Sequence, residues 1–130
     1  EIRFVKVGPH DHWGADYTMT LMLLPIMKQL RGRKYGAPFT DDDDVPEHIR
    51  STVAPVKEND WDTDGFHFVR WEWIIDEIIW AMENKLTDMN HDRFFNNETK
   101  TYDLEAAKVH EARIVNGFRL FGKYYQNMWS

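Results

Sequence analysis

The sequence predicts a mainly α-helical protein with a minor β component. Three long stretches repeat apolar residues at helical spacing, and segments rich in turn-forming residues separate them. We therefore expect helices over residues 12–31, 65–85 and 103–128, packed on one core. A small antiparallel strand pair or hairpin is expected near residues 2–7 and 92–102, where short alternating or β-prone runs flank turn residues.

Residues 65–85 carry the most concentrated apolar bulk, so the core is predicted to form around them. On a helical wheel one broad arc holds the apolar positions Trp71, Ile74, Ile75, Ile78, Ile79 and Met82. At the edge of this arc lie Glu72, Asp76 and Glu83. Roughly opposite the core lie Arg70, Glu77 and Asn84. Asp62 or Asp64 is expected to cap the start of the helix.

The first helix, over residues 12–31, is apolar nearly all round between residues 17 and 26. Such a helix is usually covered on several sides, so we expect it to be central. Pro25 lies inside this stretch and is expected to kink or split the helix. A long connection over residues 35–64 follows, in which the run Asp41–Asp44 predicts a solvated acidic loop and Trp61 is expected to contact the core.

The third helix, over residues 103–128, is predicted to begin at the N-cap Asp103. Its inward series is Leu104, Ala107, Glu111, Ile114, Phe118, Phe121, Tyr125 and Met128. Glu111 is the only charged member of that series. We therefore expect Glu111 to be mostly buried against Arg70, Arg119 or a divalent metal ion. Gly117 and Gly122 are expected to let a neighbouring helix approach closely.

Composition limits the classes of function. A length of 130 residues suits one domain over 1–130 with its own core. The formal net charge of −6 argues against general nucleic-acid binding, which needs an excess of Lys and Arg on some face. The absence of Cys excludes disulfides, thiolate zinc sites and cysteine nucleophiles. No apolar run reaches membrane-spanning length, so no membrane association is expected.

Carboxylates that point toward the predicted interior are the candidate metal site. The candidate ligands on the three helices are His12, Asp16, Glu72, Asp76 and Glu111. Oxygen-rich clusters of this kind suit Mg²⁺ or Mn²⁺. The alternative, which we favour, is that these groups form ion pairs or hydrogen bonds with nearby Arg, Thr or Trp side chains. The sequence has no motif for nucleophilic catalysis, so an enzyme is the less favoured class.

Two further sets of residues are candidates for binding. Lys28 and Arg31 could contact phosphate, although cations also suit a solvated helix C-terminus, which is the interpretation we favour. Trp61, Trp73 and Trp80 are candidates for a protein interface, because the chain has more aromatic residues than its core needs.

Several long stretches resemble a family of small proteins encoded by tailed bacteriophages. They are KYGAP at 34–38, DDDDVPEHIRSTVAP at 41–55, KENDWDTD at 57–64, HFVRWEWIIDEIIWAME at 67–83 and RIVNGFRLFGKYYQNMW at 113–129. The likeness covers nearly the whole chain from about Trp13 on. The family has no established activity, so the resemblance implies an origin and no catalytic residues. With the lack of Cys and of a signal-like start, it implies the cytoplasm of the infected host cell.

Three functions follow from these observations. The first is a phage accessory protein that needs no cofactor and acts by binding a host or phage protein or by self-association. The alternative is a metal-dependent nucleotide hydrolase, broadly similar to MazG-like all-α pyrophosphatases, with Mg²⁺ or Mn²⁺ on Glu72, Asp76 and Glu111. This chain lacks the paired ExxE and ExxD helices of that family. A structural component of the virion is a third possibility.

Overall fold

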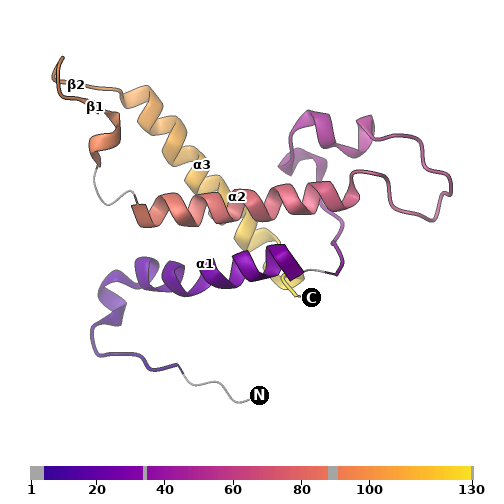
Figure 1. Ribbon diagram of the computed structural model, residues 1–130, viewed down its shortest axis with the longest axis horizontal. Coiled ribbons are helices and arrows are strands. Elements are labelled where there is room, and N and C mark those ends of the chain that lie inside the picture. Colours follow the sequence, from indigo (N-terminus) through magenta and orange to yellow (C-terminus); the bar gives the residue numbers. More distant parts are fainter. Residues whose placement is uncertain (1–4, 34, 88–90, 130) are drawn as a thin grey trace.

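Three long helices make up most of the protein, as predicted. The computed structural model describes residues 5–33, 35–87 and 91–129 (Figure 1). The long helices are α1 (Ala15–Arg33), α2 (His67–Thr87) and α3 (Leu104–Lys123). Short 3-10 turns precede α1 at Asp11–Gly14, follow α3 at Tyr125–Asn127, and lie in the connection at Asp42–Asp44, Glu47–Ile49 and Ser51–Val53. The predicted fold class, mainly α with a small antiparallel strand pair, is confirmed.

Helix α2 lies at the centre and contacts both other helices. Figure 1 shows α1 running alongside α2, while α3 crosses α2 obliquely. The core has the composition predicted for residues 65–85, since Trp71, Ile74, Ile75, Ile78 and Met82 are almost fully buried. The other segments contribute Met27 from α1, Leu120 and Tyr124 from the α3 end, and Val45 and Ile49 from the connection.

Helices α2 and α3 approach each other closely at Gly117. A Cβ atom at this position would lie 2.2 Å from the Cβ of Ala81 and 3.0 Å from the backbone oxygen of Glu77. Only glycine fits such a contact, so the predicted role of Gly117 is confirmed. The same prediction for Gly122 is wrong, because a Cβ there meets nothing within 4 Å.

The flank of α2 that carries Arg70 and Glu77 is buried, whereas the helical wheel placed it opposite the core. Arg70 is 4% exposed and Glu77 is 8% exposed. Each charge is matched: an Arg70 nitrogen lies 2.7 Å from Asp64, and the Glu77 carboxylate lies 2.6 Å from Nε of Arg113. Helix α3 and the connection both pack on this flank. They therefore bury a face of α2 that looks polar when the sequence of α2 is considered alone.

The prediction that α1 is covered on several sides is wrong. Only Thr20 and Met27 of this helix are buried. Its exposed apolar side chains are Tyr17, Met19, Leu21, Met22 and Ile26. Within the described residues α1 packs mainly on α2 and on the short turn before it, so the rest of its apolar surface faces solvent. The helix continues through Pro25 and is not split there.

The connection between α1 and α2 is tied to the rest of the protein by its acidic residues. Asp44 is 6% exposed, which corrects the prediction that the whole run 41–44 is solvated. Asp64 accepts a hydrogen bond of 2.8 Å from the backbone N–H of Phe66, in the turn just before α2, so it lies two residues ahead of the cap position that was predicted for it. Trp61 is 83% exposed and does not contact the core, contrary to expectation. Connecting segments normally run over the surface of a protein, so the part of the loop that carries Trp61 stays in solvent.

A two-stranded hairpin precedes α3. Strand β1 (Phe95–Asn96) pairs antiparallel with β2 (Thr101–Tyr102), with Phe95 opposite Tyr102. Asp103 then caps α3, accepting a 3.0 Å hydrogen bond from the N–H of Ala106. Residues 5–7 of the predicted strand 2–7 are exposed and have no strand conformation, and residues 2–4 lie outside the described part. The third helix is shorter than predicted, because the chain changes to a 3-10 turn after Lys123.

Candidate functional site

Three of the four carboxylates proposed as metal ligands are held by cations at two separate places. Nζ of Lys85 lies 2.6 Å from Asp16, and the hydrogen bond from Lys85 lowers the pKa of Asp16. Arg31 contacts Asp76 at 2.7 Å and Glu72 at 3.6 Å, and the hydrogen bond with Asp76 raises the pKa of Arg31. The first pair joins α1 to the C-terminal half of α2, and the second joins α1 to the N-terminal half.

Glu111 is exposed, which overturns its predicted burial. Arg70 and Arg119, its expected partners, instead contact Asp64 and Asp44. The reason is geometric: the inward series of α3 is narrower than predicted, with Ile114, Gly117 and Leu120 as its buried positions. Glu111 lies at the edge of that series. His12 is also exposed, and no group of three or more His, Asp or Glu within the described residues could hold a metal ion.

The phosphate candidates serve as contacts between helices. Lys28 lies 3.0 Å from Glu83 of α2. Glu83 is on the same edge of α2 as the two carboxylates that contact Arg31, but closer to the C-terminal end. Both cations are therefore matched by carboxylates of α2. This arrangement explains the polar edge of α2 at Glu72, Asp76 and Glu83, which faces the basic C-terminal half of α1.

The three candidate Trp residues have different environments. Trp73 is half-buried and packs against the core. Trp80 is covered by Arg113, whose guanidinium carbon lies 3.7 Å from the ring centroid, and by His110 at 5.3 Å. The same Arg113 pairs with Glu77, which raises the pKa of Arg113. Of the three, Trp61 alone is fully exposed.

An apolar groove of about 500 Å³ runs between α1 and α3. We call it the α1–α3 groove. It is lined by Met19, Thr20, Leu23, Ile114, Val115, Phe118 and Phe121, with Asp16, Lys85 and Glu111 at one end. A second hollow of about 590 Å³ shares Leu23 and Phe121 with it and continues toward the C-terminus. The exposed aromatic residues of that part are Tyr125 and Trp129.

The groove was not predicted from the sequence, because α1 was expected to be covered on several sides. The sequence did contain a signal for the groove: α1 carries more apolar residues than two neighbouring helices can cover. In the described residues Glu111 has no hydrogen bond or ion pair, so its carboxylate is free for a partner. Apolar walls with one acidic end are features of surfaces that bind amphipathic protein segments.

A polar pocket of about 350 Å³ lies between the connection and the start of α2. Its walls include Thr40, Asp64, His67 and Arg70. Oγ1 of Thr40 and Nε of Arg70 are buried without a hydrogen-bond partner. The other guanidinium nitrogens of Arg70 bind the Asp64 carboxylate and the carbonyl of Ile49. This arrangement ties the connection to α2, and it gives the pocket a structural role.

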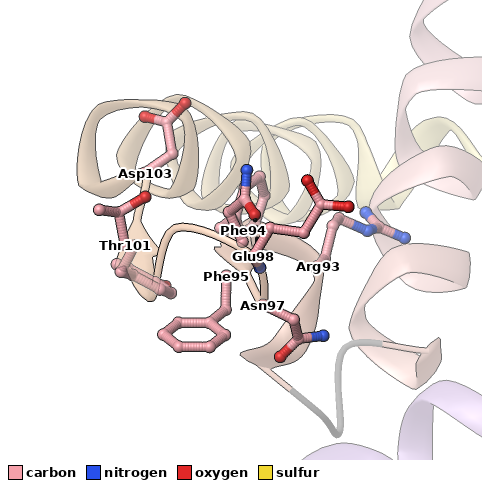
Figure 2. Close-up of a pocket in the computed structure, with 9 residues that line it drawn as sticks. Arg93, Phe94, Phe95, Asn97, Glu98, Thr101 and Asp103 are labelled. Atoms are coloured by element: carbon pink, nitrogen blue, oxygen red, sulfur yellow. Dashed lines mark hydrogen bonds between the residues drawn. The ribbon is translucent and has the colours of Figure 1, made fainter.

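A larger, open pocket of about 900 Å³ lies at the hairpin. Figure 2 shows Phe95 and Asn97 extending from the hairpin on the side away from α3, with Asp103 where β2 leads into α3. Arg93 braces the base of the hairpin, with its Nη1 3.0 Å from Asn84 and 3.2 Å from His110. The charged residues that line this pocket are Arg93, Glu98 and Asp103.

No known protein family, curated protein or solved structure matches the chain. The resemblance to proteins of tailed bacteriophages therefore remains a prediction. Among the helices of the described residues, none is long and apolar enough to cross a membrane.

Proposed function

We propose that this protein is a non-catalytic accessory protein that acts by binding another protein in the α1–α3 groove. The observation that carries the proposal is the groove itself, an apolar channel between two helices that stays open in the folded chain. Isolated exposed apolar residues are normal on soluble proteins, but a continuous apolar channel is typical of a binding surface. The resemblance described above supports a host or phage protein as the partner, in the cytoplasm of an infected cell.

The chemistry of the groove favours an amphipathic helix as the bound segment. Side chains of such a helix at i, i+4 and i+7 would contact Val115, Phe118 and Phe121, which follow one face of α3. A Lys or Arg near one end of the helix would face Glu111. The net charge of −6 also favours a basic partner.

Site-specific cross-linking tests this proposal. A photo-reactive residue at position 115, in the groove, should cross-link one polypeptide in infected cells. The matched control is position 109, which is exposed on α3 but does not line the groove. The polypeptide is then purified and its affinity measured. Val115→Glu should weaken binding by about tenfold or more, whereas Val109→Glu should not. Equal cross-linking at both positions, or equal affinity of both variants, would refute the proposal.

No observation favours the nucleotide hydrolase. Glu72 and Asp76 both contact Arg31, and Glu111 lies on another helix, at the groove. A hydrolase of that kind needs its carboxylates free and directed at one metal site.

A further inference from the structure

Helix α1 has a second apolar face that points away from α2. Along it, residues recur at alternating steps of four and three: Ala15, Met19, Met22, Ile26, Gln29 and Arg33. We call this set the outer seam. Its apolar members Met19, Met22 and Ile26 are about half exposed. A seam with this spacing matches the way one helix packs lengthwise against another helix.

The outer seam is self-complementary when two copies run antiparallel. In that orientation Met19 of one copy meets Met22 of the other, and Ala15 meets Ile26, so small and large side chains alternate. The two ends of the seam also carry opposite charges. Arg33 lies at the C-terminal end, and Asp11 lies just before the N-terminal end. A parallel pair would instead place like charges together.

Both end charges are available for a partner. Within the described residues, no carboxylate contacts Arg33. Asp11 accepts one hydrogen bond of 2.6 Å, from the backbone N–H of Gly8, and keeps its second oxygen for another donor. Because a helical side chain leans toward the N-terminus, Arg33 reaches toward the part of the second copy that holds Asp11.

The exposed area also favours a second copy. The chain exposes 9768 Å². A compact monomer of 15.6 kDa exposes about 7,200 Å². Exposed side chains of the connection and of α1 both contribute to this area. A stable dimer buries roughly 1,200–2,000 Å² in total, which this excess can supply.

We propose that two copies of the protein pair through their outer seams in an antiparallel arrangement about a two-fold axis that passes between Met19 and Met22. The long side chain of Arg33 in each copy then reaches toward Asp11 of the other copy. Met19 belongs to the outer seam and also lines the α1–α3 groove, while Ile26 and Gln29 line the second hollow. The second copy therefore forms a rim of each groove.

Sedimentation analysis of the full chain over about 1–200 µM tests the dimer. The wild type should form dimers in this range. Met22→Glu should lower the dimer affinity by at least about tenfold, because it places a carboxylate against the apolar Met19 of the other copy on each side of the axis. Leu21→Glu is the matched control: Leu21 and Met22 are both 48% exposed, but Leu21 points away from the seam. A monomeric wild type, or equal effects of the two variants, would overturn the proposal.

Exchanging the charges tests the antiparallel orientation. Asp11→Arg and Arg33→Glu should each weaken the dimer alone, because each places like charges together at both ends. An equimolar mixture should restore it, since every contact then joins opposite charges. Circular dichroism confirms that the variants are folded. A mixture no tighter than the separate variants would refute this register. Val115→Glu, which blocks the groove, should leave the dimer unchanged, so failure of the proposed function is distinguishable.

Discussion

Asp44 shows how one carboxylate can hold a long connection in place. It accepts hydrogen bonds of 2.8 Å from Arg119, 2.6 Å from Lys123 and 2.6 Å from the hydroxyl of Tyr124. Burial alone would raise the pKa of Asp44, but these three donors outweigh it and lower the pKa to about 2. Hydrogen bonds from Lys123 to Asp41 and to Asp44 in turn raise the pKa of Lys123. The connection is therefore docked on the C-terminal end of α3.

We expect Asp44→Asn to lower the free energy of unfolding by about 1–3 kcal/mol at neutral pH, because it removes the charge that two cations and a hydroxyl share. Urea unfolding followed by circular dichroism measures the change. Asp43→Asn is the control, since its side chain is exposed one residue away. A similar effect of both substitutions would mean that the network of Asp44 contributes little.

The difference between the wild type and Asp44→Asn should depend on pH. The folded-state pKa of Asp44, about 2, lies below its ordinary value of 3.8, so its stabilisation is present above pH 3.8. It is lost as the pH falls from about 4 to about 2, where the carboxylate becomes protonated in both states. The two proteins should thus converge in stability near pH 2.

Single residues are also where prediction from the sequence was weakest. Asp44, Arg70 and Glu77 were all assigned to solvent, because a helical wheel or a charge run describes one segment only. Their burial depends on partners in other segments: Arg119, Asp64 and Arg113. The prediction for Glu111 was wrong in the opposite way, since it was expected to be buried and is exposed. Its place in an apolar series suggested burial, yet the contact at Gly117 fixes a narrower buried face for α3.

At the scale of elements, the sequence was a better guide. The three helices and the hairpin lie close to their predicted positions, because apolar spacing, the cap Asp103 and turn residues act locally. The position of α1 was not predictable in this way. Its apolar residues face all directions, so the pattern identifies a helix but not which side its neighbours cover. The α1–α3 groove is a consequence of that incomplete cover.

The two glycines of α3 provide a matched test of helix packing. Gly117→Ala should lower the free energy of unfolding by about 1–3 kcal/mol, because the added methyl group would overlap Ala81 and force α2 and α3 apart. Gly122→Ala should raise stability by up to about 1 kcal/mol, because alanine favours a helix and the site is open. Thermal and urea unfolding measure both.

A second substitution identifies the cause of the Gly117→Ala effect. If the overlap with Ala81 is responsible, adding Ala81→Gly should recover part of the lost stability, even though glycine is a poorer residue for α2. If the two substitutions instead add independently, the close approach of the helices is not the reason for the glycine.

At the scale of the whole molecule, the central helix α2 joins three other segments: α1, α3 and the connection. Helix α2 contacts α1 through ion pairs and Met27, α3 through the Gly117 contact, and the connection through Arg70. Among the described residues, the other elements cover α2 well, and none of them covers the far side of α1. The half-exposed apolar side chains of α1, Met19, Met22 and Ile26, are therefore available for burial by a second chain.

This distribution predicts that thermal stability depends on protein concentration. A dimer that forms only from folded chains raises the melting temperature by mass action. We expect an increase of about 2–3 °C for each tenfold rise in concentration, measured by differential scanning calorimetry. Leu21→Glu should keep this dependence, while Met22→Glu should melt at one temperature at every concentration. A melting temperature that falls with concentration would instead indicate aggregation through the exposed apolar face of α1, which would contradict a specific antiparallel pair.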